Sequence, residues 1–116
     1  MSGKDFSKIN ISDEIIANIV INSCKNCEGI FCFEKKPFKL KNLFHNGENL
    51  KYVDIKNGDG FYKFSLYIKI YNGFSIPEIV KQIKKSVIKS VEVMTEKDVK
   101  EVNVNIVSVE FDELPD

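Results

Sequence analysis

A strand–helix–strand segment in the second half of the chain restricts the fold more than any other feature. Apolar and polar residues alternate over Phe61–Tyr71, and this alternation predicts a strand with one buried face and one open face. Ser75 and Glu78 then form a capping box with Pro77 in the first turn, which predicts the start of a helix. The apolar stripe of that helix comprises Ile76, Ile79, Val80, Ile83, Val87, Val91 and Met94.

The last predicted strand covers residues 99–111 and contains a change of phase. Its apolar residues are Val102, Val104 and Ile106 before the change, and Val107, Val109 and Phe111 after it. A slip of one residue in a two-residue period is typical of a β-bulge, where one strand carries an extra residue. We therefore expect a bulge just after Ile106.

The first half of the chain begins with a predicted helix. Ser12 is a favourable N-cap, and Asp13 and Glu14 place negative charge at the positive end of the helix dipole. Gly29 is expected to end the helical segment. The apolar stripe of this helix is formed by Ile15, Ile16, Ile19, Val20 and Cys24.

Two shorter strands and their connections complete the pattern. Residues 30–35 and 50–56 are rich in strand-forming residues, with a loop expected over residues 36–49. Residues 57–60, Asn-Gly-Asp-Gly, are a strong turn signal, because Asn and Gly tolerate positive φ. The element order is helix, strand, strand, strand, helix, strand. This order predicts an α+β fold, a two-layer sandwich of a four-stranded sheet with two helices on one face.

The 116 residues suit a single domain. We expect a flexible leader over residues 1–8, the folded domain over residues 9–112 and an acidic tail over residues 113–116. Three cysteines, an odd number, favour reduced thiols and a cytoplasmic location. No apolar run approaches the ~18 residues of a membrane span, so direct membrane insertion is not expected.

The sequence contains no recognisable catalytic or cofactor-binding motif. Its one histidine, His45, lies in the predicted loop, where a solvated side chain is a more common role than a general base. Cys24 and Cys27 could form a zinc site with Cys32 and His45, or a redox pair on their own. The alternative is core packing, because Cys24 continues an apolar stripe and Cys32 lies between two phenylalanines. We expect packing, and assign no catalytic, cofactor or metal residue.

Two groups of side chains are candidates for binding a partner. They are Lys63, Tyr67, Lys69 and Tyr71 on the open face of the predicted strand, and Lys81, Lys84, Lys85 and Lys89 on the second helix. Aromatic and basic side chains on an open sheet can anchor a protein or stack nucleic-acid bases. Strand propensity and the ordinary solvation of a helix explain the same residues. The 17 basic and 17 acidic residues cancel, which argues against nucleic-acid binding as the main role.

Several short motifs occur along the chain in a fixed order. They are Glu28-Gly29-Ile30, Leu66-Tyr67-Ile68-Lys69-Ile70, Gly73, Ile76-Pro77-Glu78-Ile79, Val91-Glu92, Met94-Thr95 and Val102-Asn103-Val104. In this order and spacing they resemble the signature of the alkaline-shock family of general stress proteins, the Gls type. The resemblance departs at three turn or bulge positions, where Asn72 replaces a Tyr of the family and Glu96 and Ser108 each replace a Gly.

The resemblance implies a non-enzymatic scaffold or interaction protein. Members of that family are cytoplasmic proteins of Gram-positive bacteria linked to cell-envelope or alkaline stress. Some are held at the membrane by a separate anchor protein, and some form assemblies. The resemblance implies no catalytic residue and no cofactor. We therefore expect a protein partner, such as a membrane-anchoring protein, and a homo-oligomer. The alternative is a small nucleic-acid-binding or regulatory module that uses the basic helix and the open sheet face.

Overall fold

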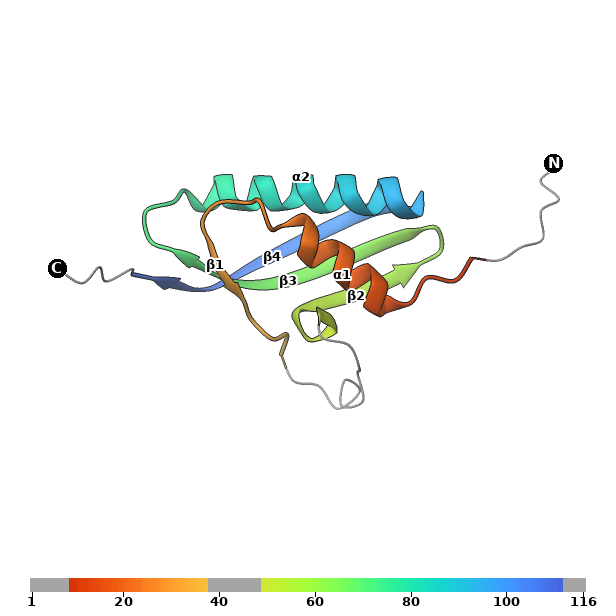
Figure 1. The fold of residues 1–116 in the computed structure, drawn as a ribbon, viewed down its shortest axis with the longest axis horizontal. Helices are drawn as coiled ribbons and strands as arrows, with labels where there is room; N and C mark the ends of the chain where they lie inside the picture. The colour runs from red at the N-terminus through yellow and green to blue at the C-terminus, as the bar shows by residue number, and fades with distance from the viewer. Residues whose placement is uncertain (1–8, 38–48, 112–116) are drawn as a thin grey trace.

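The computed structural model describes residues 9–37 and 49–111, which form helices and strands in the predicted order, with one short 3-10 helix added (Figure 1). The elements are α1 (Asp13–Ser23), β1 (Ile30–Phe33), η3 (Asn49–Tyr52), β2 (Val53–Gly58), β3 (Phe61–Tyr71), α2 (Ile76–Thr95) and β4 (Asp98–Glu110). The expected leader over residues 1–8, the acidic tail over residues 113–116 and His45 lie outside the described residues.

Strand β3 is the centre of the sheet and has neighbours on both of its edges. Strand β4 pairs parallel to β3 along its whole length, from Phe61 to Tyr71. On the other edge, β2 pairs antiparallel with residues 61–66 and β1 pairs antiparallel with residues 68–70. The sheet is therefore mixed, and its parallel pair requires the long crossover that α2 provides.

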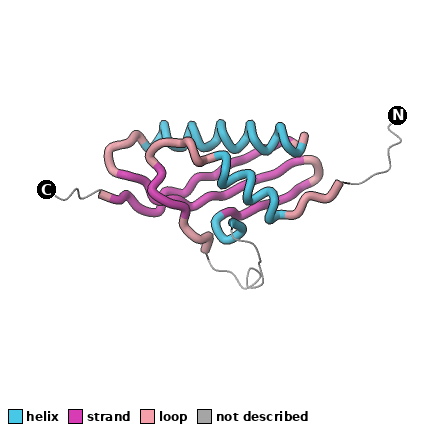
Figure 2. Tube along the Cα trace, viewed as in Figure 1, coloured by secondary structure: helices cyan, strands magenta, loops and turns pink. Residues whose placement is uncertain are grey.

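One face of this sheet carries the hydrophobic core. The inward residues of β3 are at most 1% exposed, and they are Tyr62, Phe64, Leu66, Ile68 and Ile70. Both helices pack on this face and contact each other (Figure 2). Helix α1 contributes Ile16, Ala17 and Val20, and α2 contributes Ile79, Ile83, Val87 and Val91. The predicted α+β fold, a two-layer sandwich with both helices on one sheet face, is confirmed.

The helix ends follow the capping residues read from the sequence. The Ser12 side chain accepts a hydrogen bond from Ile15 N at 3.3 Å, and Ser75 accepts one from Glu78 N at 3.4 Å. Helix α2 ends at Glu96, which adopts the left-handed conformation with a φ of 57°. This is the position where the resembled family has Gly, a residue that adopts positive φ without a steric penalty.

Helix α1 ends at Ser23, earlier than Gly29 suggested, and Gly29 instead forms the corner that leads into β1. Its φ is +93°, and a Cβ built there would lie 2.7 Å from Ile79 Cδ1. The carbonyl of Gly29 accepts a hydrogen bond from Tyr71 N at 2.9 Å. The corner needs glycine both for its backbone conformation and for the close approach of α2.

The predicted bulge is confirmed. The pairing of β3 with β4 moves from Ile68 opposite Ile106 to Lys69 opposite Ser108, so Val107 is the extra residue. Because of this shift, Ser108 and Glu110 lie on the same sheet face as Lys69 and not on the core face.

The apolar stripes of the two helices predict more buried residues than the structure contains. Ile15, Ile76 and Met94 were expected in the core, but they are 50%, 44% and 65% exposed. Ile76 and Met94 lie in the first and last turns of α2, where packing against the sheet is incomplete. Ile15 is adjacent to Ile16, and neighbours on a helix point about 100° apart, so only Ile16 reaches the core.

The strand boundaries also differ from the sequence pattern. The strand expected over residues 50–56 begins at Val53, because Asn49–Tyr52 forms η3. Asn49 Nδ2 donates a hydrogen bond to Asn18 Oδ1 at 2.8 Å and ties η3 to α1. The expected four-residue turn shrinks to Asp59 and Gly60, with a φ of +81° at Gly60, because Asn57 and Gly58 pair with β3.

Candidate interaction surface

The outward residues of β3 form the centre of a partly exposed surface, which we term the open sheet face. It comprises Lys63, Ser65, Tyr67, Lys69 and Tyr71 of β3 with their neighbours Cys32 of β1, Glu34 just after β1, Asp54 and Lys56 of β2, and Glu101, Asn103, Asn105, Ser108 and Glu110 of β4. The five β3 residues are half-buried, in strict alternation with the fully buried ones. Both helices lie on the other side of the sheet, so no described helix covers this face.

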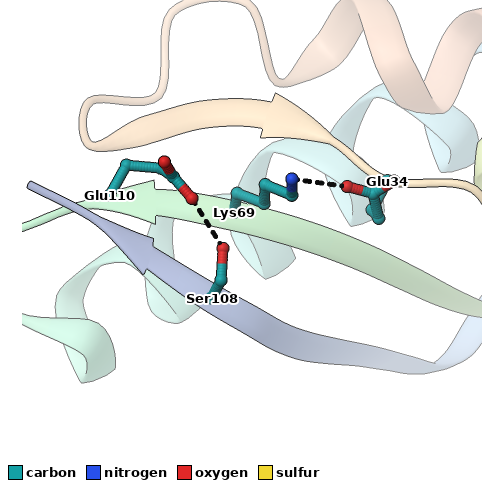
Figure 3. A network of polar contacts seen from close by, with 4 residues as sticks. All are labelled: Glu34, Lys69, Ser108 and Glu110. Atoms are coloured by element: carbon teal, nitrogen blue, oxygen red, sulfur yellow. Dashed lines mark hydrogen bonds and ion pairs between the residues drawn. The ribbon is translucent and has the colours of Figure 1, made fainter.

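Polar contacts tie one end of the open sheet face together (Figure 3). Lys69 Nζ forms an ion pair with Glu34 Oε2 at 3.1 Å, and Ser108 Oγ lies 2.9 Å from Glu110 Oε2. The hydrogen bond to Glu34 and the charge of that carboxylate, together with the more distant charge of Glu110, raise the pKa of the Lys69 ammonium group. Lys69 is therefore positioned by its neighbours and is not a freely extended cation.

The same end of the face carries an aromatic pair. The rings of Tyr71 and Phe31 meet edge to face, with centroids 5.2 Å apart. Phe31 remains 45% exposed, although it is a large apolar side chain. The sequence reasoning did not single out Phe31. The pairing of β1 with β3 shifts between Ile30 and Cys32, and this irregularity has no signal in the sequence of a four-residue strand.

The other end of the open sheet face is hollowed and charged. A depression of about 140 Å³ is lined by Asp54, Lys56, Lys63, Phe64, Ser65, Glu101 and Asn103. Lys56 lies directly opposite Lys63 across the β2–β3 pair, and Glu101 lies opposite Lys63 across the β3–β4 pair. Because cations and carboxylates alternate here, the depression does not favour an anion such as a nucleic-acid backbone.

The second predicted group lies elsewhere. Lys81, Lys84, Lys85 and Lys89 are exposed on α2. Helix α2 turns Ile79, Ile83 and Val87 toward the sheet, and its lysines point away from that layer. The two predicted groups therefore lie on opposite sides of the molecule, and a compact partner cannot contact both at once.

The side chains of Cys24 and Cys27 interact with each other, but Cys32 does not join them in one site. Cys24 is buried, and burial raises the pKa of its thiol to about 12. Cys27 Sγ lies 3.7 Å from Ser86 Oγ on α2. Cys32 pairs with Lys69 on the open sheet face, across the sheet from Cys24. Among residues 9–37 and 49–111, no three metal-binding side chains cluster, and His45 lies outside these ranges.

A larger hollow of about 540 Å³ lies at the C-terminal end of α2. Its lining comprises Ile9, Asn10, Ile11, Asn57, Tyr62, Met94, Thr95, Glu96 and Lys97. Lys97 Nζ donates a hydrogen bond to Asn57 Oδ1 at 2.6 Å and lies 4.2 Å from the centre of the Tyr62 ring. Burial, with a smaller contribution from the charge of Asp13, raises the pKa of the Tyr62 hydroxyl. The Lys97 ammonium group thus interacts with the Tyr62 ring and with Asn57. The residues that line this hollow provide no nucleophile paired with a base.

No helix in the described part of the chain is long and apolar enough to cross a membrane. Two solved structures of MamM-CTD variants, each with two substitutions, share the fold at a TM-score of 0.55. They are 11% and 9% identical to this chain, and the matches cover 88% of it and 96% and 97% of those chains. At this identity the likeness concerns the fold alone. A search of curated proteins found no match.

The sequence pattern of one protein family covers nearly the whole chain. The match extends over residues 2–111 and includes strand β3, helix α2 and strand β4. The family is described by a function related to the cell envelope, and the description names no enzymatic reaction. It is the same family that the short motifs of the sequence resemble. The chain belongs to the alkaline-shock protein family, whose function is related to the cell envelope.

Proposed function

We propose that this protein serves the cell envelope as a non-enzymatic cytoplasmic scaffold that binds a protein partner through the open sheet face. The observation that carries the proposal is the strict alternation in β3, which buries one face completely and leaves the other half-exposed without a covering helix. That face presents two tyrosines, an exposed phenylalanine and paired charges. Such side chains are typical of protein-binding surfaces, where aromatic anchors are surrounded by polar groups.

The partner fits the family's role best as a protein that holds the scaffold at the membrane, with self-association giving further contacts. Membership of a cell-envelope family supports a place near the membrane. The three described cysteines are free thiols, which agrees with a reducing compartment such as the cytoplasm. The mixed charges of the open sheet face supply hydrogen-bond donors and acceptors for a polar partner surface.

The experiment is a crosslinked pull-down from the native host, with membrane and soluble fractions kept apart. Tyr67→Ala combined with Tyr71→Ala should reduce recovery of the partner by about tenfold or more, because buried aromatic anchors carry much of an interface's free energy. Lys81→Ala combined with Lys85→Ala is the matched control on the opposite side and should leave recovery unchanged. Circular dichroism would verify that both double variants are folded.

The opposite pattern would contradict the proposal. If the lysine variant loses its partner and the tyrosine variant keeps it, the binding surface is the outer face of α2. Recovery of RNA with a steep dependence on salt would favour the nucleic-acid-binding alternative, because counterion release makes such binding sensitive to salt. The exposed lysines of α2 are the observation that keeps this alternative open.

A further inference from the structure

Strand β4 forms a long sheet edge that no described strand covers. It spans Asp98–Glu110 and pairs only with β3 in the described sheet. The opposite edge is divided between β1 and β2, which have 4 and 6 residues against the 13 of β4. An uncovered edge presents a row of unpaired backbone N–H and C=O groups, and these are a template for another strand.

The composition of this edge is unusual for a strand that stays unpaired. Residues 102–109, Val-Asn-Val-Asn-Ile-Val-Ser-Val, contain no charged residue, no proline and no glycine. Natural edge strands are normally protected by lysine, proline or bulges. In β4 the register shifts lie at Lys100 and Val107, and residues 102–106 between them contain no bulge, lysine or proline.

The central segment is also complementary to itself. Residues 102–106 read Val-Asn-Val-Asn-Ile, a pattern that is symmetric about Val104. In an antiparallel pair of two copies, Val104 would face its own counterpart, and Asn103 would face Asn105 of the other copy. Within the chain, Asn103 Nδ2 donates a hydrogen bond to Glu101 Oε2, and Asn105 Nδ2 donates one to the carbonyl of Leu66 at 3.1 Å. An asparagine amide carries a second N–H and an accepting oxygen, and through these it can also pair with an asparagine of the other copy. Both asparagines are exposed on the open sheet face, whereas the valines lie on the core face.

Building on the self-association in the proposed function, we propose that two copies of this chain join edge to edge through β4, antiparallel and centred on Val104. A contact between two copies related by a two-fold axis requires a surface that complements itself. Residues 102–106 complement themselves in the antiparallel register centred on Val104. Further apolar area is available beside this segment. Val107 of β4 is 47% exposed, and Phe111, the residue directly after β4, is 67% exposed. The two copies would then share one continuous sheet, and the helices of each copy would remain on the sheet face that they already cover.

The test uses two charge variants of the full chain, compared by sedimentation over a range of concentrations. Asn103→Lys with Asn105→Lys places lysine opposite lysine twice in the antiparallel register and should weaken dimerisation by about tenfold or more. Asn103→Lys with Asn105→Glu places lysine opposite glutamate twice and should restore dimerisation to within about threefold of the wild type.

The pair of variants also distinguishes the orientation. In a parallel pair of strands in register, residue 103 would face residue 103, so the lysine–glutamate variant would be as weak as the lysine–lysine variant. That result would overturn the antiparallel arrangement. Equal dimerisation of both variants and the wild type would exclude β4 as the contact. Both variants change exposed asparagines, so thermal unfolding should verify that they remain folded.

Failure of this inference can be separated from failure of the proposed function. Tyr67→Ala combined with Tyr71→Ala changes the open sheet face but not residues 102–106, and it should leave dimerisation unchanged. A monomeric wild-type chain that still recovers its partner in the pull-down would refute the edge-to-edge dimer and leave partner binding in place. A dimer that responds to the charge variants but recovers no partner would support the dimer and refute the partner.

Discussion

The two faces of β3 are built from alternate residues of one 11-residue strand, yet they have different physical roles. The inward side chains are almost completely buried and hold both helices against the sheet. The outward side chains are half-buried, and their contacts include the Lys69–Glu34 ion pair and the Tyr71–Phe31 aromatic pair. Burial of apolar area stabilises a fold far more than exposed polar contacts do. The inward face therefore supplies stability, and the outward face is free to change with function.

The largest expected effect comes from truncating the inward face. Leu66→Ala should lower the free energy of unfolding by about 3 kcal/mol, because it removes a side chain with 0% exposure and leaves a cavity. Ser65→Ala, the adjacent change on the open sheet face, should alter the free energy by less than about 0.5 kcal/mol. Urea denaturation of both variants gives the comparison. Similar losses in the two would show that the faces do not differ in the way described.

The second effect is a loss of stability at alkaline pH that originates on the core side. The pKa of the Cys24 thiol is about 12 in the folded chain, against 9.0 without burial. Above pH 9.0 the unfolded chain loses a proton that the folded chain retains, so stability is complete below this pH and falls as pH rises. The slope contributed by one group is at most about 1.4 kcal/mol per pH unit.

Denaturation across a pH series that crosses 9.0 measures this slope. Cys24→Ala should make the alkaline decline shallower, although it also lowers stability at neutral pH by removing a buried group. Cys32→Ala is the matched control on the open sheet face and should keep the steep decline of the wild type. If Cys32→Ala flattens the curve and Cys24→Ala does not, the assignment of the titrating thiol is wrong.

A smaller effect is expected at the end of α2, which belongs to neither face. Glu96 holds a φ of 57°, a conformation that costs a residue with a Cβ about 1–2 kcal/mol. Glu96→Gly should therefore raise the free energy of unfolding by about 1 kcal/mol, partly offset by the greater freedom of glycine in the unfolded chain. The thermal midpoint should rise accordingly. A lower thermal midpoint would mean that the Glu96 side chain stabilises the fold by more than its strained backbone conformation costs.

The smallest effect is expected from the ion pair on the open sheet face. Lys69→Met should change the free energy of unfolding very little, because exposed ion pairs are screened by water and salt. A double-mutant cycle with Glu34→Gln isolates the coupling between the two side chains. A coupling as large as the loss caused by Leu66→Ala would show that the open sheet face contributes to stability on the scale of the core.

Much of the fold could be predicted because local signals and burial agree. The alternation in β3, the capping residues Ser12 and Ser75 and the phase change at Val107 each predicted a feature that the structure contains. These signals are short in range and depend on two or four neighbouring residues. The exposure of Ile76 and Met94 could not be predicted in the same way, because it depends on where the sheet ends beneath α2.

The candidate surface could be predicted only in part. Lys63, Tyr67, Lys69 and Tyr71 share a face because one strand fixes their directions. The relation of these residues to the lysines of α2 depends on which sheet face the helix covers, and no local pattern contains that information. Phe31 lies in β1, and Glu34, the partner of Lys69, directly follows that strand. The irregular pairing of β1 with β3 is a long-range property.

The parallel pairing of β3 with β4 has a consequence for the order in which the chain folds. The hairpin of β2 and β3 needs only two connecting residues, so it can form as soon as both strands have left the ribosome. Strand β4 can join β3 only after the whole of α2 has been synthesised and has crossed the sheet. During translation one edge of β3 is therefore vacant for a longer time, and slow closure of such an edge exposes nascent chains to aggregation. Mutations that slow the docking of α2 should thus lower the yield of folded protein more than their effect on equilibrium stability suggests.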